Sequence, residues 1–132
     1  NATEKTDMSL KEKFSKVKRG IGGAPMRASI LPTTSAERKT FPIATGFMDY
    51  FPDAICAIAN LSHAATAQHH PDKPHHWDRE KSHDEEDTFL RHFMERGTLD
   101  VDGQRHSVKM CWRALAICQK EIEEEMQNGP AV

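Results

Sequence analysis

Cysteine is scarce in this 132-residue chain, and long apolar runs are absent from its sequence. The three cysteines, Cys56, Cys111 and Cys118, form no CxxC pair, and each stands among apolar residues. An odd number of isolated cysteines does not fit a disulfide framework, so we expect reduced core residues in a cytoplasmic protein. No stretch approaches the roughly 20 apolar residues that span a bilayer, which argues against a membrane protein.

A strong net charge is also missing, because 18 Lys and Arg against 20 Asp and Glu leave a formal charge of −2. The signs are nevertheless separated: residues 1–40 carry nine basic and four acidic side chains, and the remainder carries nine and sixteen. A basic arm on an acidic body can fold over a polyanionic ligand or can remain a solvated tail. The acidic body argues against nucleic acid as the partner.

Hydrophobic periodicity predicts three helices. The first runs from near Phe47 to about Gln68, and its regular part starts at Pro52, because proline is tolerated only in a first turn. The second begins near Glu80 or Ser82 and ends at Gly97, with Phe89, Leu90 and Phe93 on its apolar face. The third runs from about Ser107 to Met126, with a core stripe of Val108, Cys111, Leu115, Cys118 and Ile122.

Short connections between three helices predict an all-α fold, a helical bundle. Residues 69–79 form a loop with two prolines, and residues 98–104 form a turn that allows a short hairpin. We expect a basic, irregular arm over residues 1–37, a helical domain over residues 38–127 and a tail over residues 128–132. One chain offers few large apolar residues, so we expect a second copy to complete the bundle.

The segment from His69 to Arg113 holds most of the histidines, both tryptophans and a dense acidic cluster. Asp84 and Asp87 are three residues apart, and Glu80 precedes Asp84 by one turn, so their side chains share one helix face. Clustered carboxylates can hold a hard divalent ion such as Mg²⁺ together with phosphate oxygens. They can equally be a solvated helix start that the helix dipole favours.

The histidines of the loop have two interpretations of their own. His69, His70, His75 and His76 match no common zinc spacing, whereas imidazoles beside Trp77 suit the wall of a nucleotide pocket. Trp77 can also simply anchor the loop. The doublet His83-Asp84 resembles the metal site of HD phosphohydrolases, with candidate partners His63 and either Asp100 or Asp102.

Several cations surround the acidic residues, and they can form ion pairs or bind a triphosphate. They are Arg38, Lys39, Lys81, Arg91, Arg96, Arg105, His106 and Arg113.

Taken together and in order, these segments resemble the phage dATP/dGTP diphosphohydrolase family, the MazZ-type branch of the MazG-like enzymes. The resemblance covers about residues 38–120. It rests on Arg38-Lys39, Pro42, Gly46, FPDAICAIA at 51–59, HHPDKPHHWDREKS at 69–82, Asp84, Asp87, Arg91-His92, RGTLDVDGQRHS at 96–107 and WRALA at 112–116.

The resemblance implies an all-α nucleotide pyrophosphohydrolase that works as a homodimer or homotetramer with two or three Mg²⁺ or Mn²⁺ ions. The implied substrate is dGTP, and GTP with it, cleaved to the monophosphate and pyrophosphate. The dGMP would supply phage 2-aminoadenine nucleotide synthesis. Two alternatives stay open: an HD-type triphosphohydrolase, and an inactive module that only binds nucleotides.

The resemblance also implies roles for individual residues. Asp84 and Asp87 match the family's acidic pair as catalytic metal ligands. The general family pattern places further carboxylates on the preceding helix, where this chain has no Glu and offers only Asp53. Glu80, Glu85, Asp53 or a residue from a second chain would complete the set. The expected substrate-binding residues are Arg38, Lys39, His69, His76, Trp77, Lys81, Arg91, His106 and Arg113.

Overall fold

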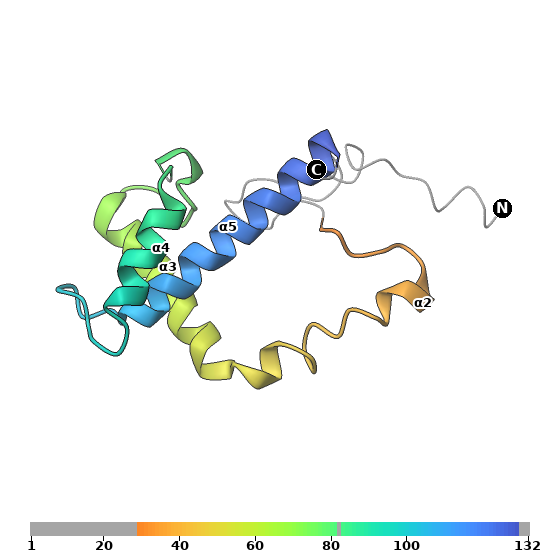
Figure 1. Cartoon of the computed structure of the whole chain (residues 1–132), viewed down its shortest axis with the longest axis horizontal. Helices are drawn as coiled ribbons and strands as arrows, with labels where there is room; N and C mark the ends of the chain where they lie inside the picture. Colours follow the sequence, from red (N-terminus) through yellow and green to blue (C-terminus); the bar gives the residue numbers. More distant parts are fainter. Residues whose placement is uncertain (1–28, 82, 130–132) are drawn as a thin grey trace. The chain divides into compact units, whose positions relative to one another are not determined.

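The computed structural model describes residues 29–81 and 83–129, and most of the described chain is helical, as predicted. Two compact units meet in the sequence between Tyr50 and Phe51, and each is considered by itself. Residues 1–28, most of the predicted basic arm, lie outside the described part. Figure 1 shows the elements, which are α2 (Ser35–Arg38), a 3-10 turn at Met48–Tyr50, α3 (Pro52–His69), a 3-10 turn at Arg79–Lys81, α4 (Glu85–Met94) and α5 (His106–Asn128).

In residues 29–50, the described part of the first unit, there are one short α-helix and a tight turn. Thr34 caps α2: its hydroxyl oxygen accepts from the Glu37 backbone N–H, and its hydroxyl group donates to the Glu37 carboxylate. The amide of Gly46 donates to the Pro42 carbonyl, 2.7 Å away. A Cβ at position 46 would lie 2.7 Å from the Pro42 ring, so only glycine permits this approach.

Helix α3 begins at Pro52 and ends at His69. Proline suits the first helical position because its φ is already helical and its missing N–H needs no partner. The helix ends where Pro71 disfavours helical geometry in the residue before it. The sequence therefore predicted both ends of the regular part to within about two residues.

Helix α4 is shorter than predicted at both ends, running from Glu85 to Met94. Residues 79–81 form a separate 3-10 turn instead of its first turn. The first turn of α4 is acidic, with Glu85, Glu86 and Asp87 beside the positive end of the helix dipole. Gly97 follows with a φ of +86°, a conformation that favours glycine.

Residues 98–105 form a turn that leads into α5. An isolated antiparallel bridge joins Leu99 to Arg105, and Gly103 adopts a φ of +80°. The predicted hairpin is reduced to this bridge in the described residues. Helix α5 then runs from His106 to Asn128 and ends at Gly129.

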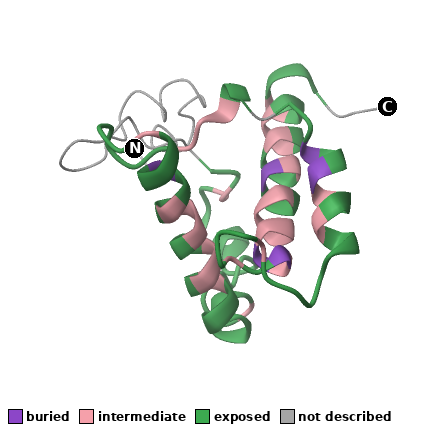
Figure 2. Ribbon diagram, turned by 90° about the vertical axis from the view of Figure 1, so that its left-hand side faces the viewer, coloured by how far each residue is buried: buried purple, intermediate pink, exposed green. Residues whose placement is uncertain are grey.

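Helix α5 is the central element of the second unit. Both α3 and α4 pack against α5, and they do not pack against each other (Figure 2). The two helices that flank the proline loop are therefore not neighbours in this bundle. The connection between them, residues 70–84, is long enough to carry the chain to the other side of α5.

Few residues of this unit are buried, as Figure 2 shows, and only two of them are apolar among those described. Val108 and Ala116 are buried, whereas Leu90, Phe93 and Leu115 are exposed. Of the predicted α5 stripe only Val108 is buried, because α4 turns Glu85 and Thr88 toward the core instead of its aromatic residues.

The expectation that the three cysteines are core residues is wrong, because Cys56 and Cys118 are exposed and Cys111 is half-buried. In the described residues, no helix is both long and apolar enough to cross a membrane.

A buried carboxylate joins α4 to α5. The Glu85 side chain is buried and accepts from Arg113 at 3.1 Å and from Lys120 at 3.3 Å. Burying an unpaired carboxylate is costly, so two cations from the facing helix fix both the position and the rotation of α4. Both carboxylate oxygens of Glu85 are thus bonded to cations of α5, so Glu85 holds the helices together and is a poor metal ligand.

Replacing Glu85 tests how much its ion pairs contribute to the stability of the fold. We expect Glu85→Ala to lower the free energy of unfolding by about 1–3 kcal/mol, because the ion pairs of this carboxylate with two half-buried cations are lost. Urea unfolding followed by circular dichroism measures this change. The control is Glu86→Ala, an exposed neighbour on the same helix, with an expected change within about 0.5 kcal/mol. Equal losses in the two variants would contradict the anchoring role.

Candidate functional site

A groove with a volume of about 490 Å³ lies in the second unit. The C-terminal half of α3 and the N-terminal part of α5 supply most of its walls. The proline loop and the turn before α5 complete it. Its polar and aromatic lining residues are Ser62, Thr66, Gln68, His69, His70, His76, Trp77, Asp78, Lys81, His92, Asp100, Asp102, Gln104, Lys109, Trp112 and Arg113.

Both tryptophans of the chain line this groove. The Trp77 and Trp112 rings meet edge to face, with centroids 6.0 Å apart and planes at 78°. The Arg79 guanidinium lies 4.2 Å from the Trp77 ring centroid and forms an ion pair with Glu123 of α5. One face of Trp77 is therefore covered, and the ring both anchors the loop and contributes to the wall. The two interpretations of Trp77 from the sequence are compatible.

The histidine loop is fastened to α3 by polar contacts. The Thr66 hydroxyl donates to the His76 carbonyl at 3.2 Å, and the Ser62 hydroxyl lies 3.1 Å from His75 Nε2. Within the loop, His76 Nδ1 lies 2.9 Å from the Pro74 carbonyl oxygen. These contacts hold the imidazole of His76 at the groove in spite of the two prolines.

A first group of potential metal ligands lies in this loop. His70, His76 and Asp78 each offer a ligand atom, and these atoms lie within 4.8 Å of one another. His70 Nε2 is 3.0 Å from the Asp78 carboxylate, and Lys81 is 3.5 Å from the same oxygen. Although desolvation opposes the shift, the His70 hydrogen bond and the charge of Lys81 lower the pKa of Asp78. The carboxylate is therefore ionised over a wide pH range.

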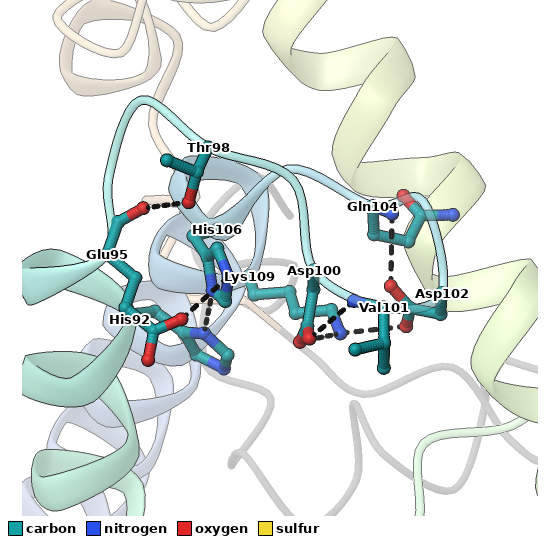
Figure 3. A network of polar contacts seen from close by, with 9 residues as sticks. All are labelled: His92, Glu95, Thr98, Asp100, Val101, Asp102, Gln104, His106 and Lys109. Atoms are coloured by element: carbon teal, nitrogen blue, oxygen red, sulfur yellow. Dashed lines mark hydrogen bonds and ion pairs between the residues drawn. The ribbon is translucent and has the colours of Figure 1, made fainter.

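A second group surrounds the start of α5 and is shown in Figure 3. His92 of α4 and His106 of α5 face each other, with their Nδ1 atoms 2.9 Å apart. His106 is buried, and its Nε2 lies 2.9 Å from the Glu95 carboxylate. Asp100 completes a set of three potential ligands within 4.8 Å. Desolvation, followed by the nearby charge of His106, lowers the pKa of His92.

Lys109 clamps the turn beside this group (Figure 3). Its ammonium nitrogen lies 2.7 Å from both the Asp100 and the Asp102 carboxylates. The Lys109 hydrogen bond is the main cause of the lowered pKa of each aspartate. The pKa of Lys109 is raised, since these two hydrogen bonds outweigh its desolvation. The turn thus presents to the groove two carboxylates that share one ammonium group.

The five carboxylates expected to bind metal do not form such a group. In the described residues, three-ligand groups arise only at the two places above. Glu85 is bonded to Arg113 and Lys120, Glu80 and Asp87 are exposed, and Asp53 lies in the first turn of α3. The physical reason is that α3 and α4 contact different sides of α5, so one chain does not bring their acidic residues together.

Asp84, the leading candidate, has local partners instead. Its carboxylate accepts from the Thr88 hydroxyl and from Arg91 Nη2, each at 3.0 Å. These hydrogen bonds, that of Arg91 first, lower the pKa of Asp84. Asp84 therefore stabilises the start of α4, and an ion at this position would have to compete with Arg91.

The substrate-binding expectations fare differently from one another. The groove brings together His69, His76, Trp77, Lys81 and Arg113. His106 lies next to groove-lining His92, whereas Arg91 is bonded to Asp84. Arg38 and Lys39 belong to the first unit, where Arg38 donates to the Pro32 carbonyl at 2.9 Å.

Sequence reasoning missed several residues that the structure places at the groove. Asp78, His92, Lys109 and Trp112 had no assigned role, and Asp100 and Asp102 entered only through the HD alternative. The members of that alternative, His63, His83 and Asp84, join no ligand group in the described residues. His92 and His106 are 14 residues apart on different helices, so no periodicity connects them. The available signals were the Asp-x-Asp-Gly sequence at residues 100–103 and the Arg-His pair, which occurs at 91–92 and again at 105–106.

Comparison with known proteins adds no relative. A scan against protein-family models gave no match. Searches of curated proteins and of solved structures gave no significant match either.

The pairing of Asp84 can be measured directly. We expect the pKa of the Asp84 carboxyl to lie below its ordinary value in the wild type and to rise in Arg91→Met, because the strongest hydrogen-bond donor is lost. A carboxyl-detected NMR titration reports both values. Arg96→Met is the control, since Arg96 contacts Phe93 and not Asp84. An unchanged pKa in Arg91→Met would contradict the contact.

Proposed function

We propose that the chain is a metal-dependent hydrolase of purine nucleoside triphosphates, with dGTP as substrate and GTP accepted, that releases pyrophosphate and the monophosphate. The observation that supports it is the groove, where two tryptophans, four histidines and three cations face one cavity. Its volume of about 490 Å³ falls within the range of small-molecule sites. The ordered sequence resemblance described above supplies the reaction and the base.

The aromatic side of the groove would hold the base. A purine has a flat apolar face, and stacking on an indole ring is worth about 1–3 kcal/mol per base. Trp77 is fixed from behind by Arg79 and from the side by Trp112, so its position is set before a ligand arrives. His76 stands in the same wall and can bond a polar edge of the base.

The cationic side would hold the phosphates. Lys81, Lys109 and Arg113 line the groove, and each is now paired with a carboxylate, respectively Asp78, Asp100 with Asp102, and Glu85. A triphosphate competes well for these donors, because charge-assisted bonds to phosphate are among the strongest hydrogen bonds. A divalent ion that binds the aspartates would free the same cations for the substrate.

The metal implied by the resemblance, Mg²⁺ or Mn²⁺, fits one part of the chain better than another. Asp84 and Asp87 lack a third ligand in the described residues of one chain, so a second copy would have to complete that site. Asp78, Asp100 and Asp102 line the groove and are oxygen donors of the type that Mg²⁺ takes. When bound, such an ion neutralises phosphate charge and supplies a water of lowered pKa.

Assembly into a homodimer or homotetramer belongs to the same proposal. Leu90, Phe93, Met94 and Leu115 are exposed on α4 and α5. A second copy that covers them would complete a core in which Val108 and Ala116 are the only fully buried apolar residues described. Such a copy is also the available source of further carboxylates for Asp84 and Asp87.

A product assay tests the chemistry. Incubated with dGTP and Mg²⁺ or Mn²⁺, the protein should release dGMP and pyrophosphate, resolved by ion-exchange chromatography. Release of deoxyguanosine and triphosphate would point to the HD alternative. Binding of dGTP without turnover in the presence of either ion would indicate a module that only binds nucleotides.

We expect Lys81→Met to raise KM about tenfold through loss of a phosphate contact, and Lys73→Met, outside the groove, to leave it unchanged.

Two aspartate variants distinguish the two metal positions. If ions bind at the helix start with a second copy, Asp87→Asn should abolish turnover, and Asp102→Asn should reduce it only modestly. If the groove aspartates hold the ion, the order reverses. Steady-state rates at several Mn²⁺ concentrations measure both effects. Full activity in both variants would contradict a carboxylate-bound ion at either place.

A further inference from the structure

The contact between His92 and His106 is not explained by packing alone. These imidazoles come from different helices, and both direct the same ring nitrogen, Nδ1, toward the other across 2.9 Å (Figure 3). Two imidazole nitrogens can lie this close if a proton is shared between them or if a cation lies beside both. In either case the arrangement brings two strong nitrogen donors to one point.

The surroundings favour a cation. His106 Nε2 lies 2.9 Å from the Glu95 carboxylate, which fixes the proton on Nε2 and leaves the Nδ1 lone pair of neutral His106 directed at His92. A carboxylate behind an imidazole is the usual support of a metal-binding histidine. Asp100 offers an oxygen that lies within 4.8 Å of one ring nitrogen of each histidine, and His92 and Asp100 line the groove.

We propose that His92, His106 and Asp100 form a two-histidine, one-carboxylate site for a first-row transition-metal ion with six-coordinate geometry, such as Co²⁺, Ni²⁺ or Fe²⁺. It differs from the oxygen-ligated Mg²⁺ or Mn²⁺ considered above, because imidazole prefers later transition metals. It stands whether or not the chain hydrolyses a nucleotide.

The spacing of the two nitrogens indicates the geometry. Metal–nitrogen bonds to histidine are about 2.0–2.1 Å long, so nitrogens 2.9 Å apart subtend an angle of about 90° at the ion. That angle belongs to neighbouring positions of an octahedron or square, whereas a tetrahedral ion needs a separation of about 3.3 Å. A site with two histidines and one carboxylate on one side of an octahedron leaves its other positions open. Here they would face the groove, where a ligand can reach them.

Lys109 is the competitor of this ion. It holds Asp100 at 2.7 Å, so Asp100 has to release Lys109 before it reaches the ion. Asp102 keeps a second contact with Lys109 at 2.7 Å and would retain the ammonium group. Removing the charge of Lys109 should therefore strengthen metal binding. If Lys109 only stabilised the turn, its removal would not increase the affinity for a metal.

Metal titration without nucleotide tests the site. With Ni²⁺ and Co²⁺ in calorimetry, the wild type should bind one ion at this position, and Co²⁺ should show the weak visible absorption of six-coordination. His92→Gln and Asp100→Asn should each weaken binding at least tenfold, and Lys109→Met should strengthen it severalfold. His76→Gln, which alters only the other histidine group, should leave this site unchanged.

Three outcomes would overturn the proposal. One is unchanged Ni²⁺ affinity in both His92→Gln and Asp100→Asn. Another is loss of binding in His76→Gln alone, which would assign the ion to His70, His76 and Asp78. The third is an intense four-coordinate Co²⁺ spectrum. Circular dichroism checks that each variant is folded, and because Asp100 lies on an exposed turn, its variant carries the test if His92→Gln unfolds.

Discussion

The packing of α4 against α5 depends on one buried carboxylate and two cations. Glu85 lies between Arg113 and Lys120, and this contact decides which side of α4 faces α5. The same rotation directs His92 toward His106 and leaves Leu90 and Phe93 outside. A helix rotated to bury its aromatic residues would carry His92 away from the start of α5. The ligand group at the groove and the exposed apolar surface are thus two consequences of one ion-pair network.

The groove depends on a second contact, between the proline loop and α5. Arg79 stacks on Trp77 and pairs with Glu123, while Trp77 meets Trp112 edge to face. Thr66 holds the loop to α3 through the His76 carbonyl. Because α3 and α4 both contact α5, the groove combines residues from four separate segments of the chain. Together these segments bring indole, imidazole, carboxylate and ammonium groups to one groove.

Charges at the groove are balanced before any ligand binds. Asp78 pairs with His70 and Lys81, and Asp100 and Asp102 pair with Lys109. Such pairs are weak where water reaches them, so they can be exchanged for stronger partners. A divalent cation would take the carboxylates and a phosphate would take the cations. Under the proposed function, this exchange would let a nearly neutral chain hold a highly charged ligand.

The sequence by itself determined the helical class, the position of three helices and the residue types of the groove. Pro52, Gly97 and the apolar periodicity act locally, so they are readable from a few neighbouring residues. The segment from His69 to Arg113 is unusually rich in histidine, tryptophan and charged residues. This composition alone was enough to select His76, Trp77, Lys81 and Arg113 as candidates. The acidic pair Asp84 and Asp87 was found in the same way, and the structure gave Asp84 a local partner instead of a third ligand.

Only the tertiary structure decided which side of each helix faces α5 and which donors meet. The hydrophobic pattern of α4 predicted burial of Phe89, Leu90 and Phe93, yet the paired Glu85 occupies the interface, since ion pairing across helices leaves no periodic signal. His92 and His106 meet through the turn at residues 97–105, and their separation of 14 residues carries no information about it. Spacing within a helix reports neighbours on that helix, whereas this site is built between helices.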